Sequence, residues 1–202
     1  MSDNAIIILA AGNASRMGAA KQLLSFNNTT FIQHIIEEAT KTTGEKVILV
    51  LGAYVDEIKT SAKKKIAHIV INPNWQTGMA SSIQTGVNAV LRLFPETENM
   101  LITVADQPFV SAELFKEIFA AKNNSDKNMV ACSYADAIGT PVLFNKKYFS
   151  ELLQLRGQEG AKKMVMKHKD DAAIIAFDKG AIDIDTEEDY EQLQKMLNAV
   201  KK

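Results

Sequence analysis

The sequence predicts an α/β fold with a mostly parallel, mixed sheet, because apolar runs alternate with segments of helical periodicity. Four near-continuous apolar runs, rich in β-branched residues, lie at 5–10, 46–51, 68–71 and 100–104. Strands that are covered by helices on both faces have this composition, since neither face meets water. The repeated succession of strand and helix favours parallel strands joined by right-handed crossovers.

Apolar residues three or four positions apart predict the helices between these strands. Such segments lie at 31–39, 83–94 and 114–119. The last third of the chain is less regular, with strands expected at 129–132, 141–144 and 172–177, and helices at 148–155, 160–168 and 186–200. Thr186 suits the N-cap of the closing helix, because acidic residues at 187–189 fill its first turn.

Length and composition indicate one domain that spans residues 1–202. Apolar residues make up 47% of the chain, too many for a disordered protein, and the net charge of -1 argues against nucleic acid as a partner. The single cysteine, Cys132, cannot form an internal disulfide. The longest early apolar run, 5–11, is too short to span a membrane. We therefore expect a cytoplasmic protein.

The loop after the first strand has the composition of a phosphate-binding site. Small residues from Ala10 to Gly12, and Gly18 beyond them, let backbone N–H groups approach a ligand at the carboxyl edge of the sheet. Arg16 and Lys21 add two cations that suit polyphosphate oxygens. The spacing fits neither a Walker loop nor a Gly-x-Gly-x-x-Gly motif. From the residues alone, a glycine-rich turn with incidental charges remains an alternative.

Acidic residues at two places are candidate metal ligands. Asp106 ends an apolar strand, where it would face the ligand crevice and suit Mg²⁺, which prefers carboxylate and phosphate oxygens. The alternative is that Asp106 caps the helix near Ser111 or opens a turn. Asp183 and Asp185 would point the same way in an extended segment. Asp185 also suits a turn or cap before the last helix.

Three further segments carry features of a substrate pocket. In 72–83, Gly78 frees the backbone, and Ser81 or Ser82 could cap the next helix and offer N–H groups to an anion. Trp75 either stacks on a ring or, as we favour, covers a hydrophobic edge. Glycine-bearing turns follow at 139–144 and 156–162, and the second opens a helix.

The loop motifs resemble a known superfamily. Leu-Ala-Ala-Gly at 9–12, Arg-Met-Gly at 16–18 and Lys-Gln-Leu-Leu at 21–24 are similar to the signature loop of nucleotidyltransferases with a Rossmann-like fold. The remaining motifs occur in the order seen in molybdenum cofactor cytidylyltransferases, over about 6–193 of the chain. They are Asn-Pro at 72–73, Trp75, Gly-Met at 78–79, Ser-Ser-Ile at 81–83, Asp-Gln-Pro at 106–108, and the segments 139–144, 157–161 and 183–189.

This resemblance implies a three-layer Rossmann-like nucleotidyltransferase fold and a set of site residues. Arg16, Lys21 and Asp106 would be catalytic, and Asp106 with Asp183 would hold Mg²⁺, Asp183 being preferred over Asp185. The implied nucleotide-binding residues are Leu9, Ala10, Ala11, Gly12, Gly18, Lys21, Gly78, Ser82 and Asp106. The implied acceptor-binding residues are Thr140, Pro141, Gly157 and Gly160.

The implied reaction transfers CMP from CTP to the phosphate of molybdopterin and releases pyrophosphate. Relatives that use GTP usually read Leu-Ala-Gly-Gly in the loop, whereas Ala11 adds a methyl group here. The family often has Gly-His-Pro where this chain has Gly139-Thr140-Pro141, and Gly-Asp-x-Gly-Ala at 157–161. Both departures concern the acceptor. A transient contact with a molybdoenzyme or its maturation factor is also implied.

The same motifs are compatible with other functions. A nucleotidyltransferase of the same fold could act on a sugar phosphate or an alcohol phosphate. A nucleotide-binding maturation factor, or a plain α/β binding module, would release no pyrophosphate. The acceptor phosphate is already ionised, so the transfer needs no general base. We therefore interpret His34, His68 and His168 as structural or surface residues, and Cys132 as a buried small hydrophobe.

Overall fold

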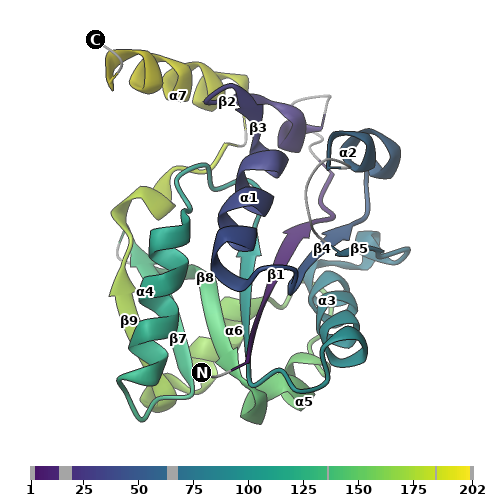
Figure 1. The fold of residues 1–202 in the computed structure, drawn as a ribbon, viewed down its shortest axis with the longest axis vertical. Coiled ribbons are helices and arrows are strands. Elements are labelled where there is room, and N and C mark those ends of the chain that lie inside the picture. Colours follow the sequence, from purple (N-terminus) through teal and green to yellow (C-terminus); the bar gives the residue numbers. More distant parts are fainter. Residues whose placement is uncertain (1–2, 14–19, 63–67, 136, 185, 201–202) are drawn as a thin grey trace.

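The computed structural model contains a seven-stranded sheet with helices on both faces (Figure 1). It describes residues 3–13, 20–62, 68–135, 137–184 and 186–200. The strand order in the sheet is β5-β4-β1-β6-β8-β7-β9. These strands are β1 (Asn4–Ala10), β4 (Val47–Leu51), β5 (His68–Ile71), β6 (Asn99–Val104), β7 (Met129–Tyr134), β8 (Ala137–Asn145) and β9 (Ala172–Ala176).

The sheet is mostly parallel, and one strand makes it mixed. Strands β5, β4, β1 and β6 pair in parallel, and so do β7 and β9. Strand β8 runs antiparallel to both β6 and β7 and joins the two parallel groups. The predicted mostly parallel mixed sheet is confirmed.

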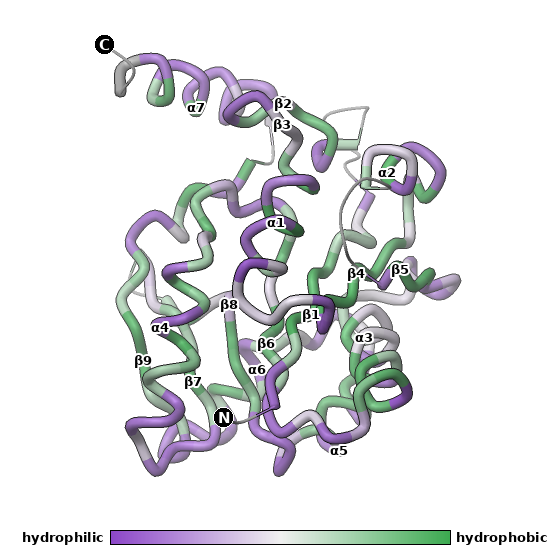
Figure 2. The backbone as a smooth tube through the Cα atoms, in the orientation of Figure 1, coloured by the Kyte–Doolittle hydropathy of each residue, from purple (hydrophilic) through white to green (hydrophobic). Residues whose placement is uncertain are grey.

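Two hydrophobic cores lie on opposite faces of the sheet, because successive side chains of a strand point to opposite sides. Ile6 and Ile8 of β1 belong to one core, with residues of α1 (Phe31–Thr43), α2 (Val55–Ala62) and α4 (Ala112–Asn123). Ile7 and Leu9 belong to the other, with residues of α3 (Met79–Leu93), α5 (Phe149–Leu152) and α6 (Ala161–Lys167). The three-layer architecture is therefore confirmed. Figure 2 shows the central strands as mainly apolar.

Two local expectations were incomplete or wrong. Helix α2 was not predicted, because its short apolar face rests on Ile58 and Ala62. The helix expected over 148–155 is the single turn α5, preceded by the 3₁₀ turn η3 (Lys146–Tyr148). Beyond α5 the chain leaves the helix, since the carbonyls of Leu153 and Leu155 accept hydrogen bonds from Gln84 of α3 at 2.9 and 2.8 Å.

The closing helix α7 (Glu187–Val200) packs away from the main sheet, against a small hairpin of β2 (Ser25–Phe26) and β3 (Thr29–Thr30) (Figure 1). Thr186 caps it as predicted, since its hydroxyl accepts a hydrogen bond from the Asp189 N–H. Tyr190 and Gln194 both donate to the carbonyl of Ser25. None of the described helices is long and apolar enough to cross a membrane.

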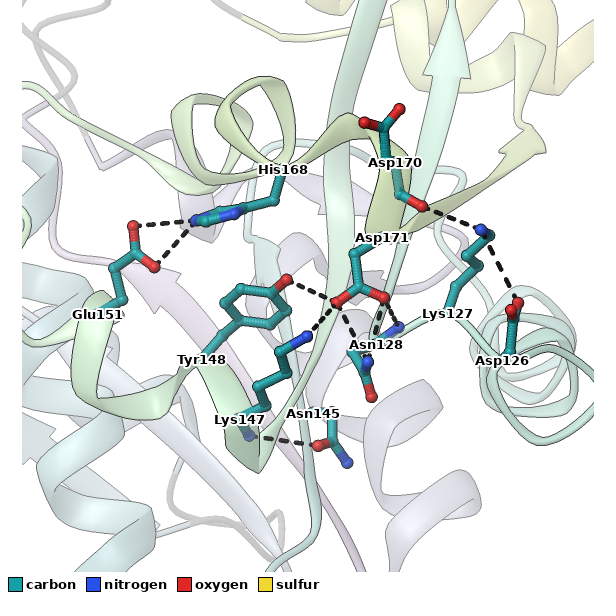
Figure 3. A network of polar contacts seen from close by, with 10 residues as sticks. All are labelled: Asp126, Lys127, Asn128, Asn145, Lys147, Tyr148, Glu151, His168, Asp170 and Asp171. Atoms are coloured by element: carbon teal, nitrogen blue, oxygen red, sulfur yellow. Dashed lines mark hydrogen bonds and ion pairs between the residues drawn. The ribbon is translucent and has the colours of Figure 1, made fainter.

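A polar network braces the amino-terminal end of the sheet, where β7 and β9 begin and β8 ends (Figure 3). The Asp171 carboxylate accepts hydrogen bonds from Asn128, Lys147 and Tyr148. Burial alone would raise the pKa of Asp171, but these hydrogen bonds outweigh it and hold the pKa well below its usual range. A second contact joins His168 at the end of α6 to Glu151 of α5.

We predict that Gly86→Ala destabilises the protein, although Gly86 lies within α3. In an exposed helix this change stabilises by about 1 kcal/mol. Here the added Cβ would lie 2.5 Å from Ile7 Cγ2 and 3.2 Å from Val50 Cγ2. Overpacking of this kind costs about 1–3 kcal/mol. Urea denaturation measures the change, with Asn88→Ala on the exposed face of the same helix as control. A more stable Gly86→Ala variant would contradict the packing of α3 on β1.

Candidate nucleotide-binding site

A cavity of about 460 Å³ opens at the carboxyl ends of β1 and β6. This is the edge at which ligands bind in open α/β sheets. Its wall is formed by the ends of the two strands, by the 3₁₀ turns η1 (Lys21–Leu23) and η2 (Trp75–Thr77), and by the start of α3. The lining residues are Leu9, Ala10, Ala11, Gly12, Asn13, Lys21, Gln22, Trp75, Gln76, Gly78, Met79, Ser82, Val104, Ala105, Asp106 and Gln158.

An ion pair between two predicted site residues lies on this wall. Lys21 Nζ is 2.8 Å from Asp106 Oδ2, although the residues are 85 positions apart in the chain. Their side chains are 15% and 29% exposed, so the pair is only partly solvated. Register explains the approach: Leu9 of β1 pairs with Val104 of β6, and the two strands therefore end together. Asp106 does not cap α4, whose N-cap is Ser111.

The loop after β1 presents its backbone to the cavity. A Cβ at Gly12 would meet no heavy atom of the described residues within 4 Å. On the other side, the Ala11 carbonyl accepts a hydrogen bond from Ala53, which fixes the loop to the end of β4. Gly52 allows this approach, because a Cβ there would lie 2.6 Å from the Ala11 oxygen. The predicted residues Arg16 and Gly18 lie outside the described residues.

The start of α3 differs from the expectation for Ser81 and Ser82. The N-cap is Gly78, with φ +120°, and no side chain caps the helix. The Ser81 hydroxyl instead contacts the Asn74 and Gly78 carbonyls, and Asn72 donates to both serines. The hydroxyl groups of both serines are therefore hydrogen-bonded to the turn at 72–74 and do not cap the helix. Ser82 is buried at the cavity wall.

The predicted acceptor residues lie near the cavity but do not line it. The Thr140 hydroxyl donates to the Gln107 side chain at 3.1 Å, and a cis peptide bond joins Thr140 to Pro141. The Gly157 carbonyl accepts a hydrogen bond from Ala80 at the start of α3. Gly160 packs closely on Met79. Gln158, between the two glycines, is the residue of this turn that lines the cavity.

Asp183 lies on a segment that is bonded to the backbone of Asp106. The Ile184 N–H donates to the Asp106 carbonyl at 3.4 Å. Ile184 is fully buried while Asp183 is exposed, which fits the predicted alternation. Burial raises the pKa of the Tyr134 hydroxyl, which also interacts with Thr140 and Gln107, and the negative charge of Asp183 raises this pKa further. Asp185 lies outside the described residues.

The donor chemistry fits a hard divalent cation. Among the described residues, no group of three His, Cys, Asp or Glu side chains could enclose a metal ion, and the cavity wall carries no His or Cys. A cation there would take carboxylate oxygens and complete its shell with ligand oxygens and water. This is the pattern of Mg²⁺ bound with a substrate phosphate.

The titratable residues that we interpreted as structural lie away from the cavity wall. His34 contacts the Val110 carbonyl, and burial lowers its pKa. Burial raises the pKa of Cys132 to about 12, so its thiol stays neutral. His168 belongs to the brace at the other end of the sheet.

Sequence reasoning missed half of the cavity wall. Asn13, Gln76, Met79, Val104, Ala105 and Gln158 are neighbours of predicted residues, and that adjacency is the signal that could have identified them. Gln22 is different: its side chain is 3% exposed, and its Oε1 has no hydrogen-bond partner among the described residues. Trp75 was predicted to cover a hydrophobic edge. It packs on the core behind α3 and also faces the cavity.

The family model of the MobA-like NTP transferase domain matches residues 6–172. The chain belongs to this family. The resemblance that the sequence motifs indicated is therefore confirmed, and the chain is a nucleotidyltransferase of the MobA-like type.

Two curated relatives cover nearly the whole chain at the same identity. The molybdenum cofactor cytidylyltransferase of Escherichia coli is 26% identical over 185 residues, which is 91% of this chain and 92% of the relative. The probable molybdenum cofactor guanylyltransferase of Bacillus cereus is 26% identical over 207 residues, 98% of this chain and 99% of the relative.

Solved structures share the fold over the same length. Rv0371c of Mycobacterium tuberculosis matches with a TM-score of 0.81 and 26% identity, covering 96% of this chain and 98% of that one. A structure of Rv0371c in complex with manganese matches with a TM-score of 0.73 and 25% identity, covering 95% and 98%.

We predict that a nucleoside triphosphate changes the fluorescence of Trp75, which is the only tryptophan of the chain and lies on the cavity wall. Lys21→Ala should shift the titration to higher concentration, because it removes a charge-assisted hydrogen bond to phosphate. The expected loss of affinity is on the order of ten- to hundredfold. Lys163→Ala, an exposed lysine on α6, is the control. Equal affinities for wild type and Lys21→Ala would exclude Lys21 from the phosphate site.

Proposed function

We propose that this protein transfers CMP from CTP to the phosphate of molybdopterin, and so forms the cytosine dinucleotide of the molybdenum cofactor. The observation that carries the proposal is the pairing of Lys21 and Asp106 on one cavity wall at the carboxyl ends of β1 and β6. A cation for phosphate oxygens and a carboxylate for a metal ion are the two groups that this reaction needs side by side.

The chemistry assigns a task to each group. An oxygen of the acceptor phosphate attacks the α-phosphorus of CTP, a new P–O bond forms, and the bond to pyrophosphate breaks. Lys21, with Arg16, neutralises the charge that grows on the leaving pyrophosphate, and backbone N–H groups near Gly12 bind its oxygens. Asp106 and Asp183 would hold Mg²⁺, which neutralises phosphate charge and orients the reacting groups when bound.

Besides neutralising charge, the site accelerates the reaction by holding the acceptor phosphate and the α-phosphorus of CTP in the orientation for attack. The ionised acceptor phosphate needs no base, which agrees with the absence of His from the cavity wall among the described residues. No described residue would contact a Cβ at Gly12, and the missing side chain lets phosphate oxygens approach the backbone there. Trp75, Met79 and Gln158 also line the cavity, and they offer apolar and amide contacts to a heterocyclic acceptor or base.

The choice of CTP rests on Ala11. Its methyl group is buried, and it takes the place of the first glycine in the Leu-Ala-Gly-Gly loop of relatives that use GTP, whereas Gly12 keeps the second. The guanylyltransferase relative has the same identity to this chain as the cytidylyltransferase, so overall similarity does not favour either base. One methyl group in a base pocket is worth about 1–3 kcal/mol of discrimination.

We predict that Asp106→Asn abolishes metal-dependent pyrophosphate release while the protein stays folded. The amide keeps the shape of the side chain but loses the charge that binds the cation. Several kcal/mol of charge stabilisation correspond to a rate loss of about a hundredfold or more. A coupled pyrophosphate assay measures the rate, and circular dichroism verifies the fold. Turnover at the wild-type rate would remove Asp106 from the metal site.

A panel of the four ribonucleoside triphosphates tests the proposed substrates. We expect CTP with molybdopterin to give the highest rate of pyrophosphate release, and GTP to rank below it. Glucose 1-phosphate and methylerythritol 4-phosphate serve as a sugar-phosphate and an alcohol-phosphate acceptor. Faster turnover with either of them would identify another nucleotidyltransferase of this fold. Binding of CTP without any pyrophosphate release would identify a maturation factor.

A further inference from the structure

The side chain of Gln107 bonds three segments together directly behind the proposed metal site. It is 3% exposed and follows Asp106 in the chain, but it does not line the cavity. Its Oε1 accepts a hydrogen bond from Thr140 of β8 at 3.1 Å. Its Nε2 donates to the Tyr134 hydroxyl at 3.1 Å and to the Gly180 carbonyl at 3.0 Å. Both ends of this amide are therefore hydrogen-bonded, the nitrogen to two acceptors and the oxygen to one donor.

The Tyr134 ring fits between two glycines of this arrangement. A Cβ at Gly139 would lie 2.0 Å from the Tyr134 hydroxyl oxygen, and one at Gly180 would lie 2.5 Å from the ring. Phe177 packs on the ring edge to face, with centroids 6.3 Å apart. Tyr134 therefore has one well-defined place, between β8 and the turn η5 (Asp178–Ala181).

Two hydrogen bonds attach the segment that carries Asp183 to Asp106 and Gln107. Gly180 is bonded to the Gln107 side chain, and Ile184 is bonded to the Asp106 carbonyl. Asp183 lies between these two points. Ile184 is anchored on its other side, in the small core with Phe26 and Leu193. The position of Asp183 relative to Asp106 thus depends on Gln107 and on the residues that fix Gln107.

We propose that Gln107 and Tyr134 are positioning residues that hold the Asp183 segment against Asp106, so that the two carboxylates can share one divalent cation. The proposal rests on the proposed function, since it assumes that these carboxylates bind the metal. Neither positioning residue lines the cavity. They act as the residues behind many metal ligands do, by fixing the ligands in place through hydrogen bonds.

The test compares two binding constants of the full-length protein. The affinity for Mn²⁺ in the presence of CTP is measured by electron paramagnetic resonance of free Mn²⁺. The affinity for CTP in EDTA is measured by Trp75 fluorescence. The variants are Gln107→Leu, which removes the amide, and Tyr134→Phe, which removes one hydroxyl and keeps the ring. Tyr148→Phe is the matched control, because its hydroxyl donates to Asp171 in the brace at the opposite end of the sheet (Figure 3).

We expect Gln107→Leu to weaken Mn²⁺ binding by about tenfold or more. Tyr134→Phe should weaken it less, and neither variant should change the affinity for CTP in EDTA. Tyr148→Phe should change neither constant. Wild-type affinity for Mn²⁺ in both variants would overturn the inference, and so would an equal loss of both affinities, which marks a purely structural role. Failure of the wild-type protein to bind Mn²⁺ with CTP would instead overturn the proposed metal chemistry itself.

Discussion

The parallel pairing of β1 and β6 is the constraint on which the site depends. The two strands end together, since Leu9 pairs with Val104 and the Ala105 N–H donates to the Leu9 carbonyl. The loops that leave this edge must therefore share one region of space, although they are far apart in the chain. Lys21 and Asp106 meet there, and partial burial of both strengthens their attraction compared with a pair on the surface. A phosphate and a cation can each take the place of one partner in this pair.

The strands and the carboxylate at the end of β6 could be predicted from the sequence because their signals are local. A fully buried strand is a continuous apolar run, and Asp106 directly follows one. Helix α2 was missed because its apolar face is short. Helix α5 ends early because Gln84, about 70 residues away in the chain, donates hydrogen bonds to the carbonyls that follow it. No local pattern reports such a contact.

The same distinction separates the predicted from the unpredicted parts of the site. The small residues of the first loop and Lys21 suggest phosphate binding by their residue types alone. The residue type of Gln107 suggests no role, because that role depends on its hydrogen bonds to β8, Tyr134 and η5. The cavity contact of Gln158 likewise depends on Gly157 and Gly78, whose backbones approach too closely for any side chain at Gly78. Family resemblance identified the glycines of this turn but not the amide between them.

The polar groups at the two ends of the sheet are arranged differently, and the difference follows from what each end must do. At the amino-terminal end, Asp171 receives hydrogen bonds from three neighbouring residues, and its low pKa keeps it charged and bonded throughout the ordinary pH range. At the carboxyl end, polar groups remain on the cavity wall, among them the buried Gln22 oxygen and the Lys21–Asp106 pair. Groups that fully satisfy one another stabilise a scaffold, whereas a binding site needs groups that can exchange partners with a ligand. Both kinds of group occur side by side at the carboxyl end: the Gln107 amide is hydrogen-bonded inside the protein, whereas the adjacent Asp106 carboxylate lies on the cavity wall.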